Sequence, residues 1–196
     1  MNGLRWMMAS AIALTMVGMA GTTAGQAQSP PPAEAPAPVE SAPTVPDGFQ
    51  TYVLPRAFSL QIPESWAATG VEADRYAVIT NYGSDRPAAT LPAAADIKTE
   101  VWLFSEPPDT FVNRSIQAIV EKEYQVSYYR SVVVDELPAL RVWMSDLPLD
   151  YPYQIITYVG YASYGTAMIV TQYATSTPET EALVEQIHNS FTLTFE

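Results

Sequence analysis

The second half of the chain constrains the fold most, because four predicted strands follow one another there with very short connections. Alternating apolar residues predict these strands at 126–134, 139–145, 153–161 and 166–174. The segments between them, DELP, DLPLDYP and ASYG, hold four to seven residues. A parallel return needs a crossover of a dozen or more residues, so each strand should pair antiparallel with the next.

Further strands are predicted upstream. Apolar and polar residues alternate from 58 to 62, which predicts a strand with Leu60 and Ile62 facing the core and Gln61 facing outward. In the later strand 139–145, Leu140, Val142 and Met144 should share one face, with Arg141 and Trp143 on the other. Other extended segments are expected at 76–82, 99–104 and 192–195.

Two helices are also expected. The first covers 111–123 with Asp109 or Thr110 as its N-cap, and the second begins at Ser176 or Thr177 with Pro178 in its first turn. Each helix should bury one apolar stripe. The stripes are Val112, Ile116, Ile119 and Val120 in the first helix, and Leu183, Val184, Ile187 and Phe191 around the second.

This order of elements predicts a single α+β domain at 49–196. Several strands precede the first helix, four more separate it from the second, and no repeat of fixed period is present. We therefore expect one antiparallel β-sheet with helices packed on it.

The first 27 residues have the composition of a signal peptide. Arg5 precedes an uncharged run at 6–21, and Gly25-Gln26-Ala27 offers a cleavage site of small residues. The uncharged run has 16 residues, which is short of the ~20 that span a bilayer comfortably. We predict a cleaved signal peptide at 1–27; an uncleaved N-terminal anchor is the alternative.

A Pro/Ala-rich segment follows at 28–48. Seven of the 19 residues from 28 to 46 are proline, and proline is excluded from helix interiors and from sheet ladders. We interpret this segment as a disordered, extended linker. The alternative is a ligand for an aromatic groove in another protein.

The charge of the chain argues against nucleic acid as a partner. The formal charge is −12, from 21 acidic and 9 basic side chains. Affinity for phosphate comes mainly from Lys and Arg, so nucleic acids and anionic lipid head groups should be repelled. We interpret the charge as an acidic, soluble surface, with attraction to a basic partner or to cations as the alternative.

Few residue types suited to catalysis are present. The chain has no cysteine, which excludes disulfides, thiolate metal sites and a lipid-modified cysteine. His188 is the single histidine. It lies late in the second helix, where a cationic imidazole would complement the helix dipole. A structural role is predicted for His188, with metal binding or catalysis as the alternative.

Acidic residues occur in close pairs, which turn geometry and solvation explain. Asp146 and Asp150, on either side of Leu-Pro-Leu, are the weak candidates for a metal site. No Gly-rich nucleotide-binding motif is present, and no cofactor is predicted. Nine of the 12 tyrosines lie between Tyr124 and Tyr173; they suit a sheet core and surface, or alternatively a protein interface.

Three residue clusters resemble PsbP-type domains, the extrinsic subunits of photosystem II and their relatives. FSLQIPESW at 58–66 is similar to the opening strand of that family, EPPDTF at 106–111 to the turn into its first long helix, and IHNSFTL at 187–193 to its closing helix and tail. The resemblance implies an antiparallel sheet sandwiched between helices. It also implies a non-catalytic lumenal or periplasmic domain that binds a larger assembly.

The sequence therefore predicts an exported, non-enzymatic accessory or binding module located in the periplasm or thylakoid lumen. We expect a protein partner there, no nucleic acid, and no transmembrane helix after signal cleavage; the oligomeric state stays open. The alternative is an envelope hydrolase or carbohydrate-binding protein that works through carboxylates and tyrosines. Two acids converging in a cleft would favour that alternative.

Overall fold

The structure is a computed structural model that describes residues 46–83, 91–162 and 164–194. These residues belong to one compact unit, Ala42–Glu196. The predicted signal peptide at 1–27 and most of the predicted linker at 28–48 lie outside the described residues.

The described residues form ten strands, two α-helices and one short 3₁₀ helix. The strands are β1 Phe49–Leu54, β2 Phe58–Pro63, β3 Ala67–Val71, β4 Tyr76–Thr80, β5 Ile97–Phe104, β6 Gln125–Val134, β7 Leu137–Ser145, β8 Tyr153–Tyr161, β9 Gly165–Tyr173 and β10 Thr192–Leu193. The α-helices are α1 Pro108–Glu121 and α2 Pro178–Asn189, and the 3₁₀ helix is η1 Glu72–Asp74.

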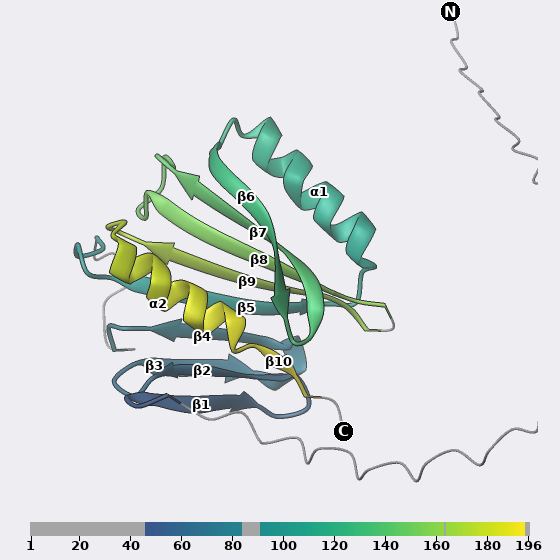
Figure 1. Cartoon of the computed structure of the whole chain (residues 1–196), viewed down its shortest axis with the longest axis horizontal. Coiled ribbons are helices and arrows are strands. Elements are labelled where there is room, and N and C mark those ends of the chain that lie inside the picture. The colour runs from purple at the N-terminus through teal and green to yellow at the C-terminus, as the bar shows by residue number, and fades with distance from the viewer. Residues whose placement is uncertain (1–45, 84–90, 163, 195–196) are drawn as a thin grey trace, which may run out of the picture. The chain divides into compact units, whose positions relative to one another are not determined.

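The strands form two antiparallel sheets (Figure 1). The large sheet has the order β3-β4-β5-β9-β8-β7-β6, and the small sheet has the order β1-β2-β10. The α+β class and the consecutive pairing of β6, β7, β8 and β9 are thus confirmed. The prediction of a single sheet is wrong, because β2 pairs with β1 and with the distant β10 instead of joining the large sheet.

The large sheet is covered on both faces. On one face, α2 and the small sheet enclose a core that includes Leu60, Ile62 and Trp143. On the other face, α1 packs against β8 and β9 over a second cluster that includes Val142 and Met144. The two faces predicted for strand β7 are therefore confirmed, and Leu60 and Ile62 are buried as expected.

Helix α1 begins earlier than expected. Its N-cap is Pro107, which makes no side-chain cap hydrogen bond, so the prediction of a cap at Asp109 or Thr110 is wrong. Phe111 and Ile119 are buried, while Val120 is 68% exposed. Val120 follows Ile119 by one position, about 100° around the helix, and so turns away from the sheet.

The remaining element predictions mostly hold. Thr177 caps α2 by accepting a hydrogen bond from Thr180 N at 3.2 Å, as expected. Val184, Ile187 and Phe191 are buried. Strand β3 was not predicted, since its sequence AATGV lacks an apolar alternation.

Strand β3 is one edge of the large sheet, and it lies against β1. A Cβ atom at Gly70 would overlap the hydroxyl of Tyr52 and the side chain of Leu54, both on β1. The opposite edge is β6, which pairs only with β7 among the described strands. Within the part of the chain that is described, no helix is both long enough and apolar enough to cross a membrane.

Candidate functional site

A row of polar side chains crosses the core beneath α2. Thr99, Thr171, Thr157 and Arg141 lie on β5, β9, β8 and β7, and His188 lies on α2. All five are fully buried. The register places Thr99 opposite Thr171 and Arg141 opposite Thr157, so the strands deliver these groups to one face of the sheet.

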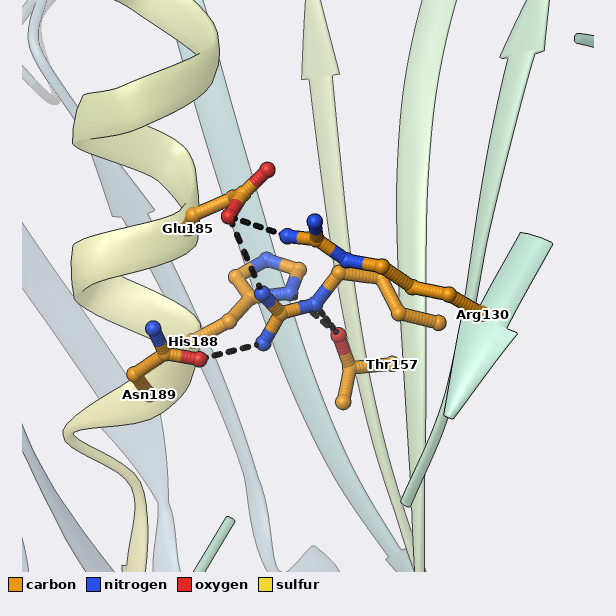
Figure 2. Close-up of polar contacts among 6 residues, drawn as sticks. Arg130, Thr157, Glu185, His188 and Asn189 are labelled. Carbon is orange, nitrogen blue, oxygen red and sulfur yellow. Dashed lines mark hydrogen bonds and ion pairs between the residues drawn. The ribbon is translucent and has the colours of Figure 1, made fainter. Parts of the chain in front are cut away.

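These five side chains form a continuous hydrogen-bonded chain. Figure 2 shows its part at Thr157 and His188, together with Arg130, Glu185 and Asn189. Arg141 Nε donates to Thr157 Oγ1 at 2.8 Å, and Thr157 Oγ1 lies 2.8 Å from His188 Nδ1. His188 Nε2 lies 2.8 Å from Thr171 Oγ1, which in turn lies 2.7 Å from Thr99 Oγ1. Both ring nitrogens of the chain's single histidine are therefore engaged inside the protein.

The guanidinium of Arg141 sets the direction of this chain. A guanidinium can only donate hydrogen bonds, so Thr157 Oγ1 accepts from Arg141. The Thr157 hydroxyl can in turn donate a hydrogen bond to His188 Nδ1. The ring then carries its proton on Nε2 and donates to Thr171, which donates to Thr99. Because this orientation gives the hydroxyl protons of Thr157 and Thr171 an acceptor, we assign His188 as the neutral Nε2–H tautomer.

The environment of His188 disfavours its charged form. Burial, and secondarily the nearby positive charge of Arg141, hold the pKa of His188 well below its usual range. The structural role predicted for His188 agrees with this position, but the expected cationic imidazole at the helix terminus is wrong. The ring points into the core, and a metal could reach either nitrogen only by displacing a threonine hydroxyl.

Arg141 connects this chain to the molecular surface. Its Nη2 donates to Asn189 Oδ1 at 2.8 Å, and its Nη1 lies 3.8 Å from Glu185 Oε2. Burial lowers the pKa of Arg141 to about 10, against the opposing effect of Glu185, so the side chain stays charged at neutral pH. Glu185 also binds Arg130 of strand β6 at 2.5 Å, which places one carboxylate between two guanidinium groups.

Sequence reasoning placed Arg141 and Trp143 on the same face of β7 but did not identify that face as buried. Thr157 and Thr171 could have indicated a buried polar row. Each is a polar residue in a largely apolar strand, at a position whose side chain faces α2. Glu185 and Arg130 gave no such signal. They are distant in sequence, and only the packing of α2 near β6 brings them together.

Residues of strand β6 form the outer end of this network of polar contacts. Arg130 lies over the ring of Trp143, with its Cζ atom 4.9 Å from the ring centroid. Tyr128 stacks on the same ring at 4.2 Å between centroids. The α2-facing side of the edge strand is thus held in place by a buried tryptophan and by Glu185.

The other side of β6 is open. Residues 125–131 are all exposed, and Tyr129 and Val133 are 72% and 70% exposed. Their partners in register are Val142 and Pro138, so both project on the α1 side of the sheet. Among the tyrosines between 124 and 173, Tyr158, Tyr161 and Tyr173 are buried, as expected for a sheet core, and Tyr128, Tyr129 and Tyr164 are exposed.

The two metal candidates, Asp146 and Asp150, lie in the connection between β7 and β8. Both are exposed, while Leu147 between them is buried and its N–H donates to Pro152 O at 3.1 Å. In the described ranges, no group of three or more His, Cys, Asp or Glu side chains is placed to hold a metal ion. The weak cation site at Asp146 and Asp150 stays a prediction.

Comparison with known proteins yields a likeness of structure only. No protein-family model matches the chain, and no curated protein matches its sequence. Among solved structures, the chain is similar to the solution structure of cyanobacterial PsbP from Synechocystis sp. PCC 6803, with a TM-score of 0.47 and 8% identity. The match covers 81% of this chain and 100% of that one. The predicted resemblance to PsbP-type domains is thus confirmed as a weak likeness.

Proposed function

We propose that this chain is an exported, non-enzymatic accessory module that binds a protein partner through strand β6. The proposed organisation is a signal peptide at 1–27, a flexible linker at 28–48 and the binding domain at 49–196. The proposed location is the periplasm or thylakoid lumen. A protein assembly at a membrane is the partner that the PsbP-type residue clusters indicate.

The observation that carries this proposal is the exposed side of β6. Tyr129 and Val133 are large apolar side chains on a regular strand, and each is at least 70% exposed. Aromatic and apolar groups concentrated at one surface are typical of protein interfaces. On its other side, the strand is attached to the sheet through the contacts of Tyr128 and Arg130 with Trp143.

The non-enzymatic part of the proposal is supported by the use of His188. A general base must reach a substrate, but this imidazole is fully buried and both of its nitrogens are hydrogen-bonded to threonines. Arg141 is equally inaccessible. The side chains of His188 and Arg141 therefore make their contacts inside the fold.

The proposal can be tested by partner capture with matched variants. The mature chain, the double variant Tyr129→Thr/Val133→Thr and the control Val53→Thr would each be immobilised and exposed to the native envelope fraction. Val53 is a fitting control because it is 53% exposed on β1, in the small sheet. We expect a protein captured by the parent and by Val53→Thr to be lost with the double variant. Equal capture by all three proteins would contradict the proposal.

A further inference from the structure

We propose that β6 binds an extended segment of another protein by strand addition, and that this segment is uncharged in its middle and basic at both ends. The inference rests on the proposed function and specifies the chemistry of the partner. It is carried by the open sheet edge, by the position of acidic residues around it, and by the repulsion that a second copy of the chain would meet.

The edge is long enough to accept a strand. Strand β6 has ten residues and pairs regularly with β7 from Tyr128 to Val134, with one irregularity between Val126 and Tyr128. At about 3.3 Å per residue it offers roughly 33 Å of backbone. Such an edge presents unpaired N–H and C=O groups, and proteins usually shorten it, cover it or place charges along it. The opposite edge, β3, lies against β1, whereas β6 has no second neighbour among the described strands.

Acidic residues bracket the strand without entering it. Strand β6, QVSYYRSVVV, contains no acidic residue. Before it come the exposed Glu121, Lys122 and Glu123, and after it come the half-buried Asp135 and the exposed Glu136. The single charge within the strand, Arg130, is already paired with Glu185. The carboxylate of Asp135 already accepts hydrogen bonds from Tyr161 Oη and Leu193 N. A bound segment therefore needs no charge in its middle, while Lys or Arg at its ends would meet the exposed carboxylates of Glu121, Glu123 and Glu136.

A second copy of this chain does not fit the same edge. If two β6 strands paired antiparallel, Glu121 and Glu123 of one copy would lie beside Asp135 and Glu136 of the other. If they paired parallel, each acidic end would meet its own counterpart. Both arrangements place like charges together at the two ends, in a chain whose formal charge is already −12.

Side chains on β6 would also select the segment. Tyr129, Ser131 and Val133 lie on the α1 side of the strand, while Tyr128 and Arg130 lie on the α2 side. Alternate side chains of an added strand would lie beside Tyr129 and Val133, which favours β-branched residues at those positions.

The test uses a labelled synthetic peptide, Lys-Lys-Thr-Val-Thr-Val-Thr-Val-Thr-Val-Lys-Lys, with the mature full chain. One comparison peptide replaces every Lys with Glu, and another replaces two central Thr residues with Pro to prevent strand formation. Fluorescence anisotropy would follow binding up to about 1 mM peptide, the range of weak association. We expect only the Lys-ended, proline-free peptide to bind, with an affinity that falls as salt is added.

Chain variants test the position of the site. Glu123→Gln/Glu136→Gln should weaken binding of the Lys-ended peptide about threefold to tenfold, the effect of losing two exposed ion pairs. The control Asp47→Asn/Glu64→Gln removes the same charge from exposed positions at the ends of β1 and β2 and should change nothing. Circular dichroism would show that both variants stay folded.

Three results would overturn the inference: no binding of the Lys-ended peptide, equal binding of the Glu-ended peptide, or equal weakening by both pairs of charge variants. A dimer of the mature chain in sedimentation that Tyr129→Lys dissociates would also overturn it and assign the edge to a second copy. These failures are distinguishable from failure of the proposed function. Capture that Tyr129→Thr/Val133→Thr abolishes, without peptide binding, would leave β6 as an interface and reject strand addition.

Discussion

Arg141 and His188 share one hydroxyl group, since Thr157 Oγ1 lies 2.8 Å from Arg141 Nε and 2.8 Å from His188 Nδ1. The first contact can only be donated by the guanidinium, and Thr157 keeps its own hydroxyl hydrogen to donate to the ring. One hydroxyl group thereby links a buried cation to a neutral histidine on another element. The stability of α2 on the sheet should depend on this chain of contacts.

Replacing His188 with leucine should lower the free energy of unfolding by about 2–4 kcal/mol at pH 8. The substitution keeps an apolar volume but leaves the hydroxyls of Thr157 and Thr171 without their ring partners in a buried site. Urea denaturation of both proteins measures the difference. A loss below about 0.5 kcal/mol, the usual range for surface changes, would mean that water or a rearrangement replaces the ring.

Stability should also depend on pH through His188. The folded pKa is lowered, so the neutral ring stabilises the fold fully above the unfolded pKa of about 6.5. Below that pH the unfolded chain takes up a proton that the folded chain cannot, and stability falls by up to about 1.4 kcal/mol per pH unit until the folded pKa is reached.

The variant His188→Gln isolates this effect from the many carboxylates, which titrate in both proteins. The stability advantage of the parent should shrink between pH 8 and pH 5, by at most about 2 kcal/mol. Urea denaturation at pH 8, 6 and 5 checks it. An advantage that stays constant across this range would show that the buried ring titrates normally.

The contributions of Glu185 and Arg141 to the free energy of unfolding should depend on each other. Glu185→Gln removes the carboxylate beside the fully buried Arg141 guanidinium and should cost about 1–3 kcal/mol, less than for a fully buried pair because Glu185 is partly exposed. In an Arg141→Met background the same change should cost less, since the buried charge is gone and Glu185 serves only Arg130. A double-mutant cycle measures this difference; strictly additive losses would argue against the coupling.

Strand β2 should tolerate change on one side only. Leu60→Ala and Ile62→Ala should each cost about 2–5 kcal/mol, because both side chains are 1% exposed in the core. Gln61→Ala should stay within about 0.5 kcal/mol, since its contact to Ser190 Oγ uses the backbone N–H. Thermal or urea denaturation of the three variants compares them. Equal losses at Leu60 and Gln61 would show that both sides of the strand are packed.

Export should remove the N-terminus after Ala27. The motivation is the short uncharged run at 6–21 followed by Gly25-Gln26-Ala27. Intact-mass spectrometry of the protein from its native envelope should find a chain that begins at Gln28. A chain that still carries residues 1–27 would instead be anchored by them.

The sequence by itself determined the last four strands of the large sheet, β6 to β9, and their local order. Period-two alternation located β6 to β9, and their short connections left antiparallel pairing of neighbours as the only solution. The same alternation assigned the two faces of β7, and local capping chemistry limited the N-cap of α2 to Ser176 or Thr177, of which the structure uses Thr177. All of these features depend on residues that are close together in the chain.

Only the tertiary structure decided what covers each face. Alternation shows that Arg141 and Trp143 share a side, but it cannot show that α2 closes that side and converts an arginine position into a core position. The separation of β2 from the large sheet, the pairing of β2 with β10 and the insertion of His188 between Thr157 and Thr171 have the same origin. Each of these contacts joins residues that are far apart in the sequence. A periodic pattern shows which side of a strand or helix is buried, but it does not show which other element packs against that side.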